Sequence, residues 1–156
     1  FDDIPLRQAR LLSREADQPG VWVAGVTSHN NAFYVLPATR GAVLFERGSF
    51  RLSGNARSGT YRLVFYVPRG TQSFGLAMRG HAKEWATFRV FDDTGALALE
   101  VQQLKKPLQQ TVATRGRDGK VWWIETSEMV DDMSFALEGI PNIVAIRPGD
   151  LMAPRE

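Results

Sequence analysis

The residues able to do catalytic chemistry are few and scattered. The 156-residue chain has two histidines, His29 and His81, and no cysteine. It contains no Gly-x-Ser-x-Gly elbow, no His-x-x-x-His pair, no phosphate-binding glycine-rich loop and no dinucleotide fingerprint. The residues of a Ser–His–Asp triad can lie far apart in the sequence, so the missing motifs do not exclude a triad. No residue of this sequence marks one out, however. We therefore expect a domain without catalytic activity of its own.

Three pairs of adjacent aspartates could supply the two carboxylates of a glycosidase, which lie about 5–9 Å apart across a cleft. Asp2-Asp3 lies near a chain end, where solvent explains it, and Asp92-Asp93 is followed by Thr94-Gly95, which is β-turn chemistry. Asp131-Asp132 fits a turn or cap, and the alternative is a structural calcium ion held together with backbone carbonyls. We expect a solvated chain end at Asp2-Asp3 and turns or caps at the other two places, with calcium as the one cofactor to consider.

Trp85 is the aromatic residue best placed to meet a ligand. It follows the polar connection Gly80–Glu84, which contains His81 and Lys83, and Arg79 ends the apolar run before it. Exposed indole rings stack on the C–H faces of sugars. The sequence thus predicts a glycan site formed by Trp85, Arg79, His81 and Lys83.

A second candidate site comes from strand alternation. If Leu63, Phe65 and Val67 face a core, then Arg62 and Tyr66 face away from it. The same alternation turns Arg79 and Arg89 outward, so the three arginines would share one face if their strands share one sheet. Guanidinium groups bind carboxylates or sulfates through paired hydrogen bonds, which favours an acidic glycan. The alternative is an ordinary solvated sheet face.

The elements that would position these residues are almost all strands. Short apolar runs of period two recur between turn residues, whereas only 125–131 and 148–153 could be helical. Asp118-Gly119 between apolar runs is a hairpin signal. The expected strands are 7–13, 20–26, 32–36, 42–46, 49–52, 61–67, 73–79, 86–91, 96–102, 111–114, 121–124, 133–137 and 143–146.

This spacing predicts an all-β fold, an antiparallel β-sandwich of the jelly-roll kind. We expect one domain over residues 1–147, with 148–156 as an exit segment or linker stub. The expected core residues are Leu63, Phe65, Val67, Phe74, Leu76, Met78, Phe88, Val90 and Trp122.

Composition narrows the range of partners. Nineteen Lys and Arg against 17 Asp and Glu give a net charge of +2, too balanced for a general nucleic-acid binder. No apolar run approaches the roughly 18 residues that span a bilayer, and no signal peptide is recognisable. The chain starts at Phe1, so we expect a mature product or a domain of a longer protein.

Several of these patterns resemble a known group of domains. The resemblance rests on the motifs Tyr61-x-Leu63-x-Phe65-Tyr66-Val67-Pro68-x-Gly70-Thr71, Phe74, Val90-Phe91-Asp92-x-x-Gly95 and Gly116-x-Asp118-Gly119-Lys120-Val121-Trp122. Over residues 60–140 the sequence resembles the jelly-roll accessory domains of bacterial polysaccharide-degrading enzymes, the galactose-binding-like type of carbohydrate-binding module. The resemblance implies a secreted or periplasmic, non-catalytic, glycan-binding role within a larger enzyme. It also implies a ligand on a sheet face or on loops at one edge, and often a structural calcium.

Two functions from different classes follow. The first is a carbohydrate-binding module that targets a larger enzyme to a polysaccharide or oligosaccharide. The second is a structural sandwich that packs against a neighbouring catalytic domain and binds no sugar. A binding module should leave ligand-accessible polar or aromatic side chains, whereas a packing domain should expose a matching apolar patch.

Overall fold

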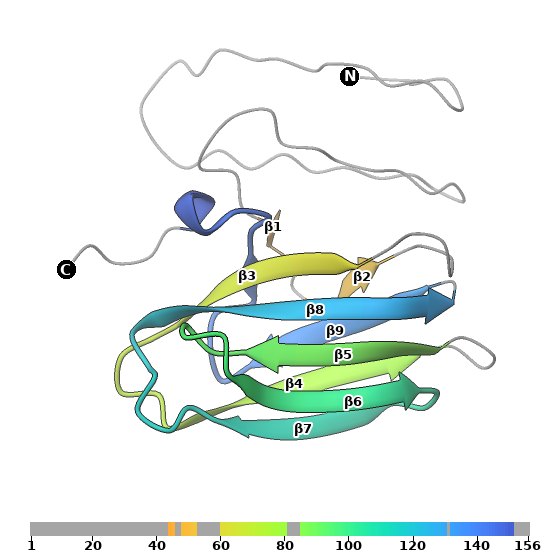
Figure 1. Cartoon of the computed structure of the whole chain (residues 1–156), viewed down its shortest axis with the longest axis horizontal. Helices are drawn as coiled ribbons and strands as arrows, with labels where there is room; N and C mark the ends of the chain where they lie inside the picture. Colours follow the sequence, from red (N-terminus) through yellow and green to blue (C-terminus); the bar gives the residue numbers. More distant parts are fainter. Residues whose placement is uncertain (1–43, 46–47, 53–59, 81–84, 131, 152–156) are drawn as a thin grey trace, which may run out of the picture. The chain divides into compact units, whose positions relative to one another are not determined.

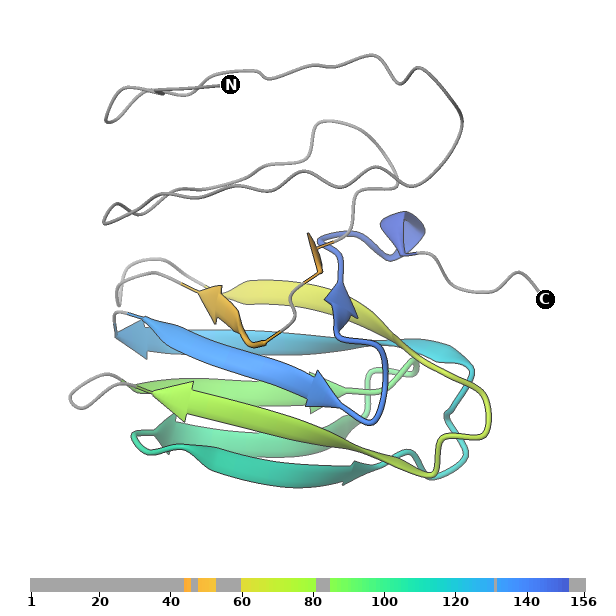
Figure 2. The same cartoon turned by 180° about the vertical axis from the view of Figure 1, so that it is seen from behind.

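The fold is an antiparallel sandwich of two four-stranded sheets (Figures 1 and 2). The computed structural model describes residues 44–45, 48–52, 60–80, 85–130 and 132–151, all within the compact unit Val35–Glu156. The strands are β1 (Leu44–Phe45), β2 (Phe50–Leu52), β3 (Tyr61–Val67), β4 (Ser73–Gly80), β5 (Trp85–Phe91), β6 (Leu97–Leu104), β7 (Leu108–Ala113), β8 (Lys120–Val130), β9 (Met133–Glu138) and β10 (Ile143–Val144).

The strand order is that of a jelly roll. One sheet has the order β2-β9-β4-β7 and the other β3-β8-β5-β6. The antiparallel pairs β5–β6, β4–β7, β3–β8 and β2–β9 are nested one inside the next along the chain, as in a long hairpin folded over itself. The short pair β1–β10 lies outside this plan. The predicted all-β, antiparallel jelly-roll sandwich is confirmed.

The core lies between the two sheets and contains every residue predicted for it. Each of the nine is at most 7% exposed, and Phe65, Val67, Leu76, Phe88 and Val90 are fully buried. Trp122 faces inward and Trp123 outward, as alternation requires. Val64 is buried as well, although it faces outward, because Ala145 pairs with it in both backbone directions at 2.8 and 2.9 Å.

The expectation of helix at 125–131 is wrong, because β8 continues as a strand to Val130. Its inward residues are Trp122, Ile124 and Thr126, and then Met129, one position later than strict alternation allows. Glu128 causes this shift. It has a φ of 52° and forms a β-bulge opposite β5. An extra residue in the strand destroys the period of two on which the sequence pattern depends.

The hairpin expected at Asp118-Gly119 is also wrong. The strands on either side, β7 and β8, belong to different sheets, so this turn crosses the sandwich. It is held by the β3–β4 crossing, because Gly119 N–H donates to the Val67 carbonyl (2.8 Å) and Gly70 N–H donates to Asp118 Oδ2 (2.7 Å). Turn chemistry is local, whereas the sheet that receives the next strand is decided by the core.

The remaining expectations fall at the chain ends. The strands expected at 7–13, 20–26 and 32–36 lie outside the described residues, and so the single domain over 1–147 stays a prediction. The expected runs 42–46 and 49–52 contain β1 and β2. In the tail, Pro148–Asp150 forms one 3-10 turn. Within the described ranges, no helix has the length and apolar character needed to cross a bilayer.

Phe65→Ala should destabilise the domain by about 3–5 kcal/mol, since it leaves a cavity beside Phe74 in the closed core. The matched control is Leu97→Ala, because Leu97 is 50% exposed and its truncation should change the free energy of unfolding by less than about 0.5 kcal/mol. Urea unfolding followed by tryptophan fluorescence measures both. Equal effects of the two variants would contradict the assigned core face.

Candidate functional site

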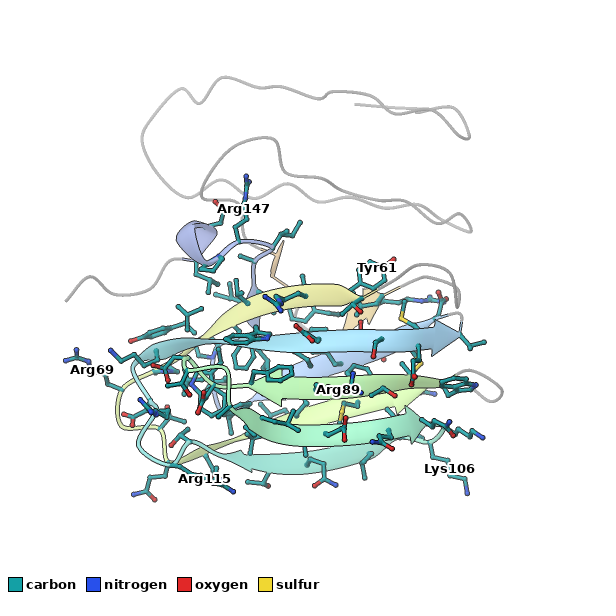
Figure 3. All side chains as sticks on the ribbon, viewed as in Figure 1. Tyr61, Arg69, Arg89, Lys106, Arg115 and Arg147 are labelled. Carbon is teal, nitrogen blue, oxygen red and sulfur yellow. The ribbon has the colours of Figure 1, made fainter. Side chains whose placement is uncertain are left out.

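The outer face of the β3-β8-β5-β6 sheet carries a row of alternating charges. Arg62 on β3 lies opposite Glu125 on β8, Glu125 lies opposite Arg89 on β5, and Arg89 lies opposite Glu100 on β6. Tyr66 projects from the same face. The structure therefore places Arg62, Arg89 and Tyr66 on one face, with Tyr66 farther along β3 opposite Val121 (Figure 3, where Arg89 is labelled at the centre of this face).

Both arginines of this face are already bound to carboxylates. Arg62 Nε donates to Glu125 Oε1 at 2.8 Å, and Arg89 Nε donates to Glu100 Oε1 at 2.7 Å. Arg89 also donates to Ser127 Oγ at 3.1 Å. The hydrogen bond from Arg89, with a second from Gln102, lowers the pKa of Glu100. The glutamates of the chain therefore neutralise the arginines of this face, and an acidic ligand would have to displace them.

Trp123, the central ring of the same face, is also occupied. Phe91 from β5 stacks on it with ring centroids 5.4 Å apart, and the Arg62 guanidinium from β3 lies 5.3 Å from its ring centroid. These two side chains come from the strands on either side of β8. The Trp123 Nε1 atom is buried without a hydrogen-bond partner in the described part of the chain. A ring packed in this way is a structural element and offers no open platform for a sugar.

Arg79 lies elsewhere. The assumption that β3, β4 and β5 share a sheet is wrong, because β4 belongs to the β2-β9-β4-β7 sheet. Met78 and Gly80 face the core, so Arg79 points to the outer face of that second sheet. There it lies in one row with Ser134 of β9 and Arg51 of β2. Arg79 is thus separated from Arg62 and Arg89 by the whole thickness of the sandwich.

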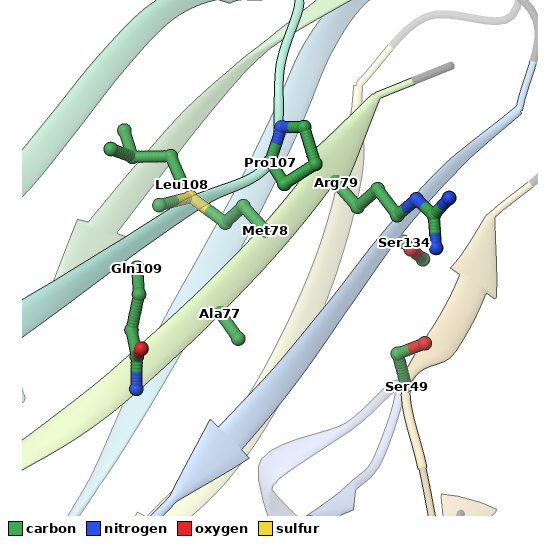
Figure 4. Close-up of a pocket in the computed structure, with 8 residues that line it drawn as sticks. All are labelled: Ser49, Ala77, Met78, Arg79, Pro107, Leu108, Gln109 and Ser134. Atoms are coloured by element: carbon green, nitrogen blue, oxygen red, sulfur yellow. The ribbon is translucent and has the colours of Figure 1, made fainter.

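Arg79 borders a shallow groove of about 410 Å³. In Figure 4 its side chain extends across the sheet toward Ser134, with Ser49 beyond it, and Gln109 projects farther along the groove. Ala77 forms part of the floor. The lining residues are Ser49, Ala77, Met78, Arg79, Pro107, Leu108, Gln109 and Ser134.

Small side chains keep this face open along β4. The outward positions before Arg79 are Gly75 and Ala77, and Ala77 lies opposite Ala136 on β9 and Gln109 on β7. A Cβ atom at Gly75 would come within 3.0 Å of the Glu138 side chain. Glu138 in turn accepts a hydrogen bond from the Gln109 amide. Glu138 therefore covers the outward face of Gly75, and the groove has its low floor at Ala77, with the Gln109 side chain beside it.

Arg79 differs from the other arginines of the two outer faces in its electrostatics. Arg51, in the same row, is bound to Asp132. Arg62 and Arg89 are bound to glutamates. Arg79 is exposed and has no ion-pair or hydrogen-bond partner in the described part of the chain. Its guanidinium is therefore available to an external anion.

The predicted loop site does not come together around one ligand. Trp85 precedes the inward-facing Ala86 and projects from the outer face of the β3-β8-β5-β6 sheet, half-buried. Arg79 projects from the outer face of the opposite sheet. His81 and Lys83 lie outside the described residues. Trp85 and Arg79 consequently belong to different surfaces.

The possible calcium ion finds no ligand set in the described ranges. They contain no group of three acidic or histidine side chains that could hold a metal ion. Asp132 is bound to Arg51, and Asp131 lies outside the described residues.

The groove residues contributed by β7 and β9 were not anticipated from the sequence. Ser134 and Gln109 are ordinary polar residues, and only the pairing of β4 with both β9 and β7 places them beside Arg79. The alternation of Gly75 and Ala77 with Phe74, Leu76 and Met78 was a readable signal, because it predicts a strand whose outward face is bare.

The β5–β6 turn, which packs over Trp123, contains a carboxylate with a shifted pKa. Burial raises the pKa of Asp92, but hydrogen bonds from the Thr94 hydroxyl and from the N–H groups of Thr94 and Ala96 outweigh it, with help from the Arg117 charge. The net effect lowers this pKa below 3.8. Gly95 closes the turn at φ 86°, and a Cβ atom at this position would lie 3.6 Å from the Trp123 ring. The predicted β-turn at 92–95 is confirmed.

Asp92→Asn should reduce the acid sensitivity of the fold. A carboxylate with a lowered folded-state pKa stabilises the protein above its unfolded pKa, and that contribution is lost as the pH falls through the folded value. Asparagine keeps the Oδ1 acceptor but does not titrate. In urea unfolding at about pH 6 and about pH 2.5, the variant should lose less stability on acidification than the unmodified protein. Equal losses would contradict this role for Asp92.

Comparison of this chain with family models, with curated proteins and with solved structures found no match. The candidate site is therefore defined by geometry and charge. It consists of the groove on the β2-β9-β4-β7 sheet, with Arg79 as its unneutralised cation and Ser134, Gln109 and Ser49 as its hydrogen-bonding groups.

Proposed function

We propose that this domain is a non-catalytic carbohydrate-binding domain that holds an acidic glycan in the groove of the β2-β9-β4-β7 sheet. The observation that carries the proposal is Arg79, an exposed arginine without a partner in the described chain, at the rim of a groove with a floor of small residues. A guanidinium pairs with carboxylate or sulfate through two parallel hydrogen bonds. Neutralising Arg79 is thus the interaction that an acidic sugar supplies.

The rest of the groove suits a saccharide ring. Ala77 and Ala136, opposite each other on β4 and β9, are small, so that a flat ring can lie close to the pleated backbone beside Arg79. Hydroxyl groups of the ring can bond with the Gln109 amide and the Ser134 hydroxyl, which flank that floor. Sheet geometry fixes these groups in advance, so little conformational entropy is lost when the ligand binds.

The resemblance to jelly-roll accessory domains supports the same role. It suggests a secreted or periplasmic location in a bacterium and a neighbouring catalytic domain that acts on the bound polysaccharide. In this proposal the domain increases the local concentration of its parent enzyme at the glycan, and the groove supplies selectivity for charged sugars.

Arg79→Ala should weaken binding of an oligogalacturonide about 10- to 100-fold, because a hydrogen bond to a charged group contributes about 1.5–3 kcal/mol. Arg115→Ala is the matched control. It removes the same charge from an exposed arginine beyond the opposite end of β7, and its affinity should stay unchanged. Isothermal titration calorimetry with acidic and neutral oligosaccharides gives both values. Affinity for the acidic ligand should also fall as salt rises, because exposed charges are screened over about 10 Å at 0.1 M.

Two outcomes would contradict the proposal. If Trp85→Ala abolishes binding while Arg79→Ala does not, the ligand lies on the other side of the sandwich. If the folded domain binds neither acidic nor neutral glycans, the alternative function applies, in which the sandwich packs against a neighbouring catalytic domain without binding sugar.

A further inference from the structure

The four outer edges of the two sheets are not equally protected. Edge strands present unpaired N–H and C=O groups, and proteins normally shorten, bulge, charge or cover them. β2 is only three residues long, and β3 is covered by Ala145, which bonds to Val64 in both directions. β6 is bulged near Gln103, whose φ is 49°. In contrast, β7 pairs with β4 in unbroken register over its whole length.

The free side of β7 is regular and uncharged. Its six residues, Leu108–Ala113, include no acidic or basic side chain, and β7 is the last strand of its sheet in the described part of the chain. At about 3.4 Å per residue, this edge is about 20 Å long. It is long enough to pair with an extended segment of five or six residues.

The hydrogen-bond register identifies the groups that face outward. Thr114 N–H donates to the Gln72 carbonyl at 2.9 Å, and antiparallel neighbours alternate between bonded and non-bonded pairs. Val112 and Gln110 therefore bond toward β4. Gln109, Thr111 and Ala113 direct their N–H and C=O groups to the open edge, where three residues supply six backbone groups in strand geometry.

Positively charged side chains flank the two ends of β7. Lys105 and Lys106 precede β7 and Arg115 follows it, and all three are exposed with no ionic partner in the described ranges. A second copy of the chain is a poor partner. Antiparallel pairing of two β7 strands would bring the lysines of one copy beside Arg115 of the other, and like charges across strands are destabilising. A segment with acidic residues at both ends is complementary.

We propose that β7 is a docking edge for an extended peptide segment that has an uncharged, β-branched centre and acidic ends. The peptide adds a fifth strand to the β2-β9-β4-β7 sheet. Main-chain hydrogen bonds from Gln109, Thr111 and Ala113 provide the affinity, and the flanking cations select the acidic ends. This surface adjoins the glycan groove at Gln109, whose side chain lines the groove, but it uses the backbone groups of β7 that face the open edge.

The test uses the acetylated and amidated peptide Glu-Glu-Thr-Val-Thr-Val-Thr-Glu-Glu, labelled for fluorescence anisotropy. The control peptide has the same centre and lysines at all four end positions. Only the acidic peptide should bind, and hydrogen exchange by NMR should show newly protected amides at Gln109, Thr111 and Ala113. The amides of Gln110 and Val112 should be protected already in the free protein.

Two sets of variants test the edge and the charges separately. Thr111→Pro removes an outward N–H without breaking a bond to β4 and should abolish binding, whereas Thr111→Val keeps the N–H and should bind as the unmodified protein does. Lys105→Glu combined with Lys106→Glu should weaken the acidic peptide about tenfold and strengthen the lysine-ended one. This charge reversal decides the matter if Thr111→Pro fails to fold.

Several results would overturn the proposal. Equal affinity for both peptides would exclude charge selection. Protection of amides outside β7, or binding that survives Thr111→Pro in a folded protein, would exclude strand addition. A concentration-dependent dimer in sedimentation experiments, lost in Thr111→Pro, would show that a second copy occupies the edge instead.

Discussion

Phe74 of one sheet lies between two rings of the other, and this contact fixes how the sandwich closes. Its ring centroid is 5.5 Å from that of Phe65 and 5.6 Å from that of Trp122, both in edge-to-face geometry. Trp122 also donates from Nε1 to the Arg117 carbonyl at 2.8 Å, which ties the β7–β8 crossing to the core. Since a one-residue slip would turn every side chain of a strand to the other face, this cluster determines the register of β3, β4 and β8 together. Every assignment of an outward residue depends on it.

The two outer faces that result have opposite electrostatic characters. On the β3-β8-β5-β6 sheet, arginines and glutamates alternate across the strands and neutralise one another, and Trp123 is packed between Phe91 and Arg62. On the β2-β9-β4-β7 sheet, Arg51 is bound by Asp132, whereas Arg79 is left beside a floor of small residues. The same residue type is therefore structural on one face and available on the other, because a neighbouring strand either does or does not supply a carboxylate at that register position.

Two β-bulges lie on either side of β5, one on β8 and one on β6. Glu128 on β8 and Gln103 on β6 both have positive φ values, which are uncommon for residues other than glycine. The Thr87 hydroxyl connects the two bulges. It donates a hydrogen bond to the Glu128 carboxylate at 2.9 Å and accepts one from the Gln103 N–H at 3.5 Å. Thr87 is almost fully buried between them. The bulges shift the inward positions of β6 and β8 by one residue, which restores Leu104 and Met129 to the core beside Ala86.

The sequence by itself determined the all-β class, the jelly-roll sandwich, the core face of β3, β4 and β5, the opposite directions of Trp122 and Trp123 and the turn at Asp92, because alternation and turn chemistry act between near neighbours. It left a helix possible at 125–131, where the Glu128 bulge interrupts the alternation, and it predicted a hairpin at Asp118-Gly119, where the chain changes sheets. Only the tertiary structure decided that Arg62 and Arg89 share a sheet while Arg79 lies on the other, and that Trp85 and Arg79 point to opposite surfaces. Strand pairing in a jelly roll joins segments far apart in the chain, such as β3 with β8 and β4 with β9, and local patterns carry no information about such partners. The groove was unpredictable for the same reason, since its floor and walls come from three strands that meet only after the sheets have formed.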